Sequence, residues 1–231
     1  MRGLLLLAAA VLAWVTWAAP WGAAPPPLAP EASLLVGGSA EMPVALALDA
    51  WGAPHIAYVR PGEPLAIWYQ PPAGPAELVG AAGDARHGDI TLSLALDGAG
   101  RPGLAYVDDR SGDLLYAARA GGAWRLERVD AAGRVGYAPS LAFDGAGQPH
   151  VSYFDHSNND VKYGWRETGR WSIETVDASG EPGFFIPAGF TSLALAAPER
   201  AGAAAAPRLA YLAFRYKPYD GELRYAERTD A

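Results

Sequence analysis

The sequence predicts an all-β fold made of four repeats of one four-stranded antiparallel unit. Short apolar runs alternate with turn-forming clusters along most of the chain, which is the pattern of strands joined by tight turns. One pattern recurs every 47 to 48 residues. The 27 Gly and 20 Pro among 231 residues also favour turns over long helices. The best-formed copy spans 140–177, SLAFDGAGQPHVSYFDHSNNDVKYGWRETGRWSIETVD.

The N-terminal segment, residues 1–24, is expected to be a signal peptide or an N-terminal anchor. Arg2 supplies a positive start, and an uncharged apolar run follows from Gly3 to Trp17. That run is short for a membrane span and suits a signal peptide. A Pro-rich spacer, PPPLAP, occupies 25–30. The rest of the chain is therefore expected to be secreted or held in the cell envelope, with no membrane span in the mature form.

Each repeat opens with a predicted hairpin. Asp49, Asp97 and Asp144 each end an apolar run, at spacings of 48 and 47 residues. A Gly-containing turn follows, and a Pro then begins the next strand. Asp and Gly accept the positive φ of such turns, and Pro at the first residue of a strand removes no ladder hydrogen bond. We interpret the three aspartates as structural turn residues. The hairpins read ALALDAWGAPHIAYV (45–59), SLALDGAGRPGLAYV (93–107) and SLAFDGAGQPHVSYF (140–154).

The third and fourth strands complete each repeat. The third carries a central tyrosine, and the last of these tyrosines reveals a fourth copy with strands at 192–196 and 208–214. Such regular tyrosines are expected to pack between repeats rather than to form a site. They are Tyr69, Tyr116, Tyr163 and Tyr225 in strand three, and Tyr58, Tyr106, Tyr153 and Tyr211 in strand two. Fourth strands are AELVG (76–80), WRLERVD (124–130) and WSIETVD (171–177).

The fourth copy lacks a fourth strand, whereas EASLLVGG at 31–38 resembles one and precedes the first copy. A β-propeller leaves no unpaired edge when an N-terminal strand completes its last blade. The sequence therefore predicts one four-bladed β-propeller domain over 31–231, which is expected to be a monomer. Its blades are 44–80, 91–130, 139–177 and 191–228, the last closed by 31–37. The alternative is a truncated half-propeller that assembles with another copy.

The repeated pattern SLALDxxGxPHxxYxD…LxYAxxxGxWxxExVD resembles the blades of secreted bacterial β-propeller repeat proteins, similar in kind to sialidase-like and lectin-like propellers. The resemblance covers about residues 31–228 and implies the fold, because propellers host binding, scaffolding and catalysis alike. The sialidase hallmark Ser-x-Asp-x-Gly-x-x-Trp fits no copy. Thr175, Asp177, Gly180 and Phe184 come nearest, with the Gly one place late. The catalytic roles of that family are therefore not carried over.

Composition narrows the classes of ligand. The net charge of −7 and the absence of any Lys/Arg run longer than two argue against nucleic acid. With no Cys, disulfides and Cys-ligated zinc are excluded. No cofactor is expected. Oxygen-rich turns offer Ca²⁺ binding as a weaker alternative to simple hydrogen bonding of the local backbone. Their residues are Asp108, Asp109, Asp113, Asp155, Asn158, Asn159 and Asp160.

Departures from the repeat concentrate around the fourth copy, where two long loops carry aromatic residues beside Arg and Lys. In a propeller, these loops and the turns joining strands two and three are expected on one face, where aromatics can stack on sugars or peptides. His55 and His150 share one repeat position and are interpreted as half-buried strand histidines. The predicted ligand-binding residues are Phe184, Phe185, Arg215, Tyr216, Lys217, Tyr219, Asp108, Asp155 and His156.

The function predicted from these observations is an exported binding or scaffold module that recognises a surface glycan or protein through loops on one face. The alternative is a sialidase-like or lyase-like hydrolase that uses loop carboxylates such as Asp108 and Asp155. No Ser, His and acid grouping with a nucleophile-elbow context occurs, which weakens the hydrolase alternative.

Overall fold

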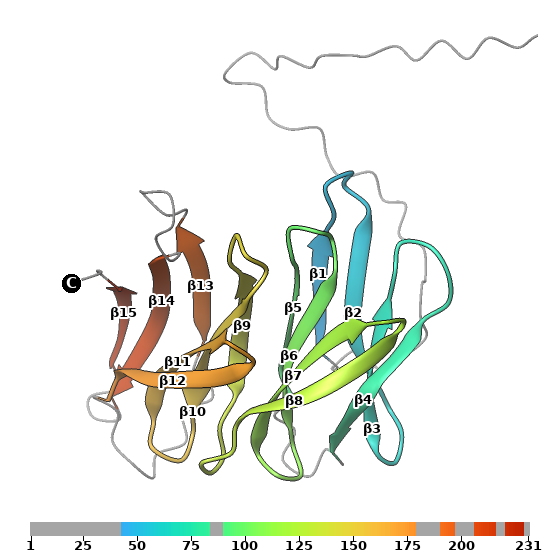
Figure 1. The fold of residues 1–231 in the computed structure, drawn as a ribbon. Helices are drawn as coiled ribbons and strands as arrows, with labels where there is room; N and C mark the ends of the chain where they lie inside the picture. The colour runs from blue at the N-terminus through green and yellow to red at the C-terminus, as the bar shows by residue number, and fades with distance from the viewer. Residues whose placement is uncertain (1–42, 84–89, 179–189, 197–205, 216–219, 229–231) are drawn as a thin grey trace, which may run out of the picture. The chain divides into compact units, whose positions relative to one another are not determined.

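Four antiparallel sheets make up the part of the chain that the computed structural model describes, residues 43–83, 90–178, 190–196, 206–215 and 220–228 (Figure 1). Each sheet follows chain order, so every strand pairs with its sequence neighbour. The predicted all-β fold of sheets resembling propeller blades is confirmed. Within these ranges no helix is long and apolar enough to cross a membrane.

We call the sheets blades one to four. Blade one contains β1 (Val44–Leu48), β2 (Pro54–Arg60), β3 (Leu65–Gln70) and β4 (Glu77–Gly83). Blade two contains β5 (Leu92–Leu96), β6 (Pro102–Asp108), β7 (Asp113–Ala120) and β8 (Ala123–Asp130). Blade three contains β9 (Tyr137–Phe143), β10 (Pro149–Asp155), β11 (Asp160–Glu167) and β12 (Arg170–Asp177). Blade four contains β13 (Thr191–Ala196), β14 (Ala206–Arg215) and β15 (Asp220–Glu227). The predicted closing strand, 31–37, lies outside the described residues.

The repeated aspartates organise the first hairpin of blades one to three. Oδ1 of Asp97 accepts hydrogen bonds from the backbone N–H groups of Ala99 and Arg101, both at 2.9 Å. Gly100 completes the turn at a φ of 75°, which favours glycine. Asp49 and Asp144 accept the equivalent pairs of N–H groups. The structural interpretation of these aspartates is therefore confirmed.

Aromatic side chains fill the space between neighbouring blades. Tyr106 and Tyr153 are fully buried. Edge-to-face contacts join strand three of one blade to strand four of the next: the ring centroids of Tyr69 and Trp124 are 5.2 Å apart, and an equivalent pair joins blades two and three. The predicted packing role of the tyrosines is confirmed in blades one to three. Tyr225 in blade four is the exception, because it is 60% exposed.

The innermost strands are linked by serine side chains. Oγ of Ser93 on β5 accepts a hydrogen bond from the backbone N–H of Leu141 on β9. Oγ of Ser140 on β9 accepts one from the N–H of Leu193 on β13. Leu141 and Leu193 are 7% and 9% exposed, whereas Leu46 at the same repeat position of β1 is 62% exposed. Within the described part of the chain, blade one therefore has an exposed apolar strand whose counterparts are buried.

Candidate functional site: a cleft between blades two and three

A buried histidine occupies the same position in blades one and three. His150 on β10 shares a 2.5 Å hydrogen bond between its Nδ1 and the hydroxyl of Tyr163, and its Nε2 lies 3.6 Å from Oδ2 of Asp144. Burial lowers the pKa of His150, although Asp144 opposes that shift. The equivalent residues in blade one are His55, Tyr69 and Asp49. Both histidines lie within the strand as the repeat predicts, each with two partners in its own blade.

Blade two lacks this histidine. Gly103 takes its place, so the hydroxyl of Tyr116 loses the partner that the equivalent tyrosines have. That hydroxyl makes no hydrogen bond to any residue described, although Tyr116 is only 5% exposed. A Cβ atom at Gly103 would lie 2.6 Å from Cζ of Phe143. The ring of Phe143, from the end of β9, therefore leans over the backbone where a histidine stands in blades one and three; blade four has Arg208 at this position.

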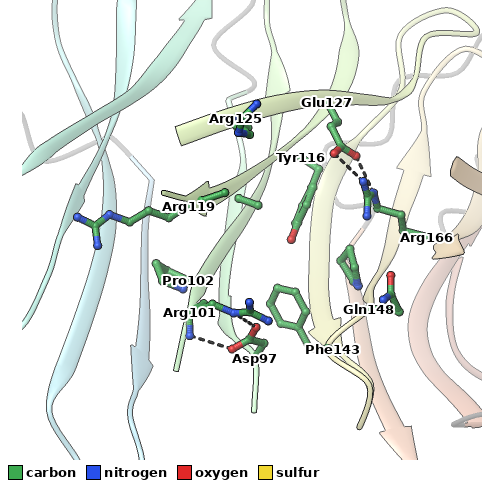
Figure 2. Close-up of a pocket in the computed structure, with 14 residues that line it drawn as sticks. Asp97, Arg101, Pro102, Tyr116, Arg119, Arg125, Glu127, Phe143, Gln148 and Arg166 are labelled. Carbon is green, nitrogen blue, oxygen red and sulfur yellow. Dashed lines mark hydrogen bonds and ion pairs between the residues drawn. The ribbon is translucent and has the colours of Figure 1, made fainter. Parts of the chain in front are cut away.

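A cleft of about 300 Å³ opens at this position, between blades two and three. It is formed by the first hairpins of both blades, by β7 and β8, and by Arg166 on β11. Figure 2 shows Tyr116 and Phe143 in its middle. The lining residues are Asp97, Arg101, Pro102, Tyr116, Ala118, Arg119, Ala120, Arg125, Glu127, Phe143, Gly147, Gln148, Pro149 and Arg166.

Two ion pairs flank the aromatic rings, one on each side (Figure 2). Nε of Arg101 donates to Oδ2 of Asp97 at 2.6 Å. Arg166 binds both carboxylate oxygens of Glu127, at 2.8 and 2.9 Å. Burial opposes ionisation of Asp97, but hydrogen bonds from the backbone and side chain of Arg101 outweigh it and hold the pKa of Asp97 below its usual value. Both carboxylates of the cleft are thus bound by arginine side chains.

The pair at Glu127 belongs to a contact that recurs between blades. Oε2 of Glu127 on β8 also accepts a hydrogen bond from the indole N–H of Trp171. Glu77 on β4 binds Arg119 and Trp124 of blade two in the same way. This glutamate, arginine and tryptophan set is therefore a repeated bridge, and Arg119 points away from the other labelled side chains in Figure 2. The features that set the cleft apart are Tyr116, Phe143, Arg101 and Arg125.

Two arginines offer unused hydrogen-bond donors to the cleft. Arg101 uses its Nε on Asp97, and its two Nη groups bond to no residue described. The side chain of Arg101 is 67% exposed. Arg125 on β8 is exposed and forms no ion pair within the described part of the chain. The cleft thus combines an aromatic wall, the hydroxyl of Tyr116 and two available guanidinium groups.

The described residues among those predicted from the sequence to bind ligand do not line the cleft. Asp108 ends β6 and Asp155 ends β10, so both lie at the opposite ends of the strands from the cleft. Asp155 is fully buried, with Lys162 Nζ at 2.6 Å, and His156 follows it. Phe184, Phe185, Tyr216, Lys217 and Tyr219 lie outside the described residues, as does the side chain of Arg215. Whether the predicted set comes together therefore stays a prediction, because most of its members lie outside the described residues.

The oxygen-rich turns mainly bind their own backbone. Oδ1 of Asp155 accepts hydrogen bonds from the N–H groups of Ser157 and Asn158, and Oδ1 of Asp108 accepts one from the N–H of Arg110. Among residues with described positions, no three His, Cys, Asp or Glu side chains gather as metal ligands would. The geometry of these turns is that of local capping.

Sequence reasoning missed the cleft, although part of its signal is in the sequence. Gly103 stands where His55 and His150 stand, and Phe143 stands where the other copies have leucine. Each departure is minor by itself. Their significance comes from blade packing, which places Phe143 of one blade over Gly103 of the next.

No family model and no curated protein matches the chain. Similar solved structures include a fucose lectin from Kordia zhangzhouensis in complex with methyl-fucoside. Its sequence identity to this chain is 14%, the alignment covers 57% of this chain and 96% of the lectin chain, and the TM-score is 0.38. An endo-1,4-beta-xylanase from Bacteroides thetaiotaomicron is 13% identical; the alignment covers 80% of this chain and 67% of the xylanase chain, with a TM-score of 0.42. An exo-beta-1,3-galactanase from Clostridium thermocellum is 10% identical; the alignment covers 80% of this chain and 45% of the galactanase chain, with a TM-score of 0.43. Similarity this remote carries no argument about the ligand of this chain.

Proposed function

We propose that this protein is an exported glycan-binding module and that the cleft between blades two and three holds the sugar. The observation that carries the proposal is the hydroxyl of Tyr116, which lies at the cleft without a partner among the described residues because Gly103 replaces the repeat's histidine. A tyrosine hydroxyl that opens onto a cleft and bonds no protein group keeps its donor and acceptor available for a ligand or water. A sugar hydroxyl can bond to it.

The rest of the cleft supports a sugar as the ligand. Sugars combine an apolar ring face with many hydroxyl groups, so their sites pair an aromatic surface with directed polar groups. Phe143 supplies an aromatic surface, while Tyr116, Arg101 and Gln148 supply polar groups around it. Small-molecule sites have volumes from roughly 300 Å³ upward, which places this cleft at the small end of the range.

The same geometry favours binding over catalysis. A glycoside hydrolase needs a carboxylic acid whose pKa is raised, so that it can protonate the leaving group. The pKa of Asp97 is instead held below its usual value, and Glu127 is bound by Arg166 through both oxygens. Asp155, proposed from the sequence for the hydrolase alternative, is fully buried.

The proposal is tested by rebuilding the repeat in blade two. The double variant Gly103→His/Phe143→Leu restores the two residue types that the repeat has at these positions in blade one. The introduced imidazole would then bond the hydroxyl of Tyr116 and fill the cleft. We expect the wild-type protein to bind sugars on a glycan array and the double variant to lose that binding, with an unchanged or higher midpoint of denaturation.

Gly145→His is the matched control, because a Cβ at Gly145 meets no heavy atom within 4 Å. Binding that persists in the double variant would reject the cleft as the site. The fourth-blade loops predicted from the sequence would then be tested with Tyr216→Ala/Tyr219→Ala. A wild-type protein that binds no sugar would reject the proposed function, and a surface protein as partner would be tested next.

A further inference from the structure

We propose that the cleft selects sugars that carry a carboxylate, such as uronic acids, and that Arg101 and Arg125 bind that group. This inference rests on the proposed glycan binding and names the class of sugar. It starts from the charges around the cleft. Four arginines line it against two carboxylates, in a protein whose net charge is −7. The cleft is therefore locally positive on a negative molecule.

Ion pairs with carboxylates neutralise most of these arginines, but the guanidinium groups of Arg101 and Arg125 can still donate hydrogen bonds to a ligand. Arg166 is taken by Glu127, and Arg119 by Glu77 on blade one. Arg125 is the cleft arginine with no carboxylate partner among the residues placed by the structure. A neutral sugar needs no such uncompensated charge, whereas an anionic one is attracted by it.

Arg101 is positioned to offer two parallel N–H donors to the ligand. Asp97 binds its Nε at 2.6 Å, and Asp97 is itself fixed by two backbone N–H groups of the hairpin. The Nη1 and Nη2 groups of Arg101 then face solvent without a partner in the described chain. Two parallel N–H donors match the two oxygens of a carboxylate. Because the Nε contact already orders the side chain, binding costs less conformational entropy than it would for a free arginine.

The two arginines flank the aromatic centre of the cleft from different elements: Arg101 precedes β6 and Arg125 lies on β8. A sugar ring resting against Phe143 with a hydroxyl near Tyr116 would hold a carboxylate substituent at the edge of the ring, within the region that these arginines line. Contacts to the sugar ring and contacts to its carboxylate therefore contribute separately to the binding affinity, and each can be tested by itself.

The experiment measures binding of D-glucuronic and D-galacturonic acid beside D-glucose and D-galactose by calorimetry, with the intact chain. We expect each acid to bind at least about tenfold more tightly than its neutral counterpart, as one charge-assisted contact would give. Arg125→Gln should remove this preference, because it should weaken binding of the acids far more than binding of the neutral sugars. Added NaCl should weaken binding of the acids alone, because salt screens exposed charges.

Arg110→Gln is the control, since it makes the same charge change on an exposed residue in the loop between β6 and β7. Equal affinity for acidic and neutral sugars, both lost in Gly103→His/Phe143→Leu, would overturn this inference and leave the proposed function standing. Acetate binding as tightly as the uronic acids would overturn it as well, because the site would then be one for simple anions. Failure of every sugar to bind would reject the proposed function itself.

Discussion

Individual tyrosines of one repeat position differ in how their hydroxyls are satisfied. Tyr153 donates a hydrogen bond to Oδ2 of Asp130 at 2.6 Å, and Lys162 lies 3.4 Å from the same oxygen. Gly80 stands at the repeat position of Asp130, so the hydroxyl of Tyr106 is buried without a partner among the described residues. The same side chain is thus part of a polar network in blade three and acts as a packing group in blade two.

This contrast predicts opposite outcomes for one substitution. Tyr153→Phe removes a hydrogen bond to a buried carboxylate and should lower the free energy of unfolding by about 1–3 kcal/mol. Tyr106→Phe removes a hydroxyl that bonds nothing described, and should change it by less than about 0.5 kcal/mol or raise it. Urea denaturation of both variants measures the difference. Equal losses in the two variants would contradict the contrast, because the hydroxyl of Tyr106 would then need a partner of its own.

At the scale of the element, the first hairpin of each blade depends on one aspartate. Oδ1 of Asp49 accepts hydrogen bonds from the N–H groups of Trp51 and Ala53, at 2.9 and 2.7 Å. Asp49→Ala should therefore cost about 1–2 kcal/mol of unfolding free energy, as the loss of a helix-capping side chain does. Asp49→Asn keeps an acceptor oxygen and should cost less than half as much. Denaturation midpoints of the two variants measure the difference. Equal losses in Asp49→Ala and Asp49→Asn would mean that the negative charge of Asp49, and not its acceptor oxygen, stabilises the hairpin.

Much of the fold at this scale could be predicted from the sequence, because each strand and turn carries its own local signal. The spacing of Asp49, Asp97 and Asp144 predicted the hairpins, and short apolar runs between turn-forming clusters predicted the strands. The cleft could not be predicted in that way. It depends on Phe143 of one blade meeting Gly103 of another, and a contact between blades leaves no periodic trace in either strand.

At the scale of the whole molecule, the exposed apolar side chains of β1 in blade one indicate a surface that another part of the chain or a second molecule covers. Val44, Leu46 and Leu48 on β1 are 66%, 62% and 60% exposed, and Leu223 on β15 is 77% exposed. The three side chains of β1 are on one face of one strand, and exposed apolar patches of this kind mark surfaces that bind another surface. The sequence predicts that the strand 31–37 closes the ring by completing blade four, or, in the alternative, that the chain assembles with another copy. Either arrangement would bring a neighbour to β1.

Leu46→Ser tests whether this surface is covered. If a neighbour covers β1, the variant should lose about 2 kcal/mol or more of unfolding free energy, as Leu193→Ser should at the buried equivalent position. If nothing covers β1, the loss should stay below about 0.5 kcal/mol. Light scattering and the dependence of stability on protein concentration then separate closure within one chain from assembly of two copies, because only the second changes with concentration.

The replacement of histidine by Gly103 also bears on valency. The repeat position holds histidine in blades one and three, Arg208 in blade four and glycine in blade two alone. If the cleft of blade two is the sugar site as proposed, the described blades would have one such site, and one molecule would hold one glycan chain without linking it to another. His150→Gly/Leu195→Phe would copy the arrangement of blade two into blade three. Two linked sites can exceed the affinity of either by about 10²–10⁴ on a surface that presents many sugars. Under the proposed function, the strength of binding to a surface that presents many sugars would therefore rise with the number of blades in which glycine replaces this histidine.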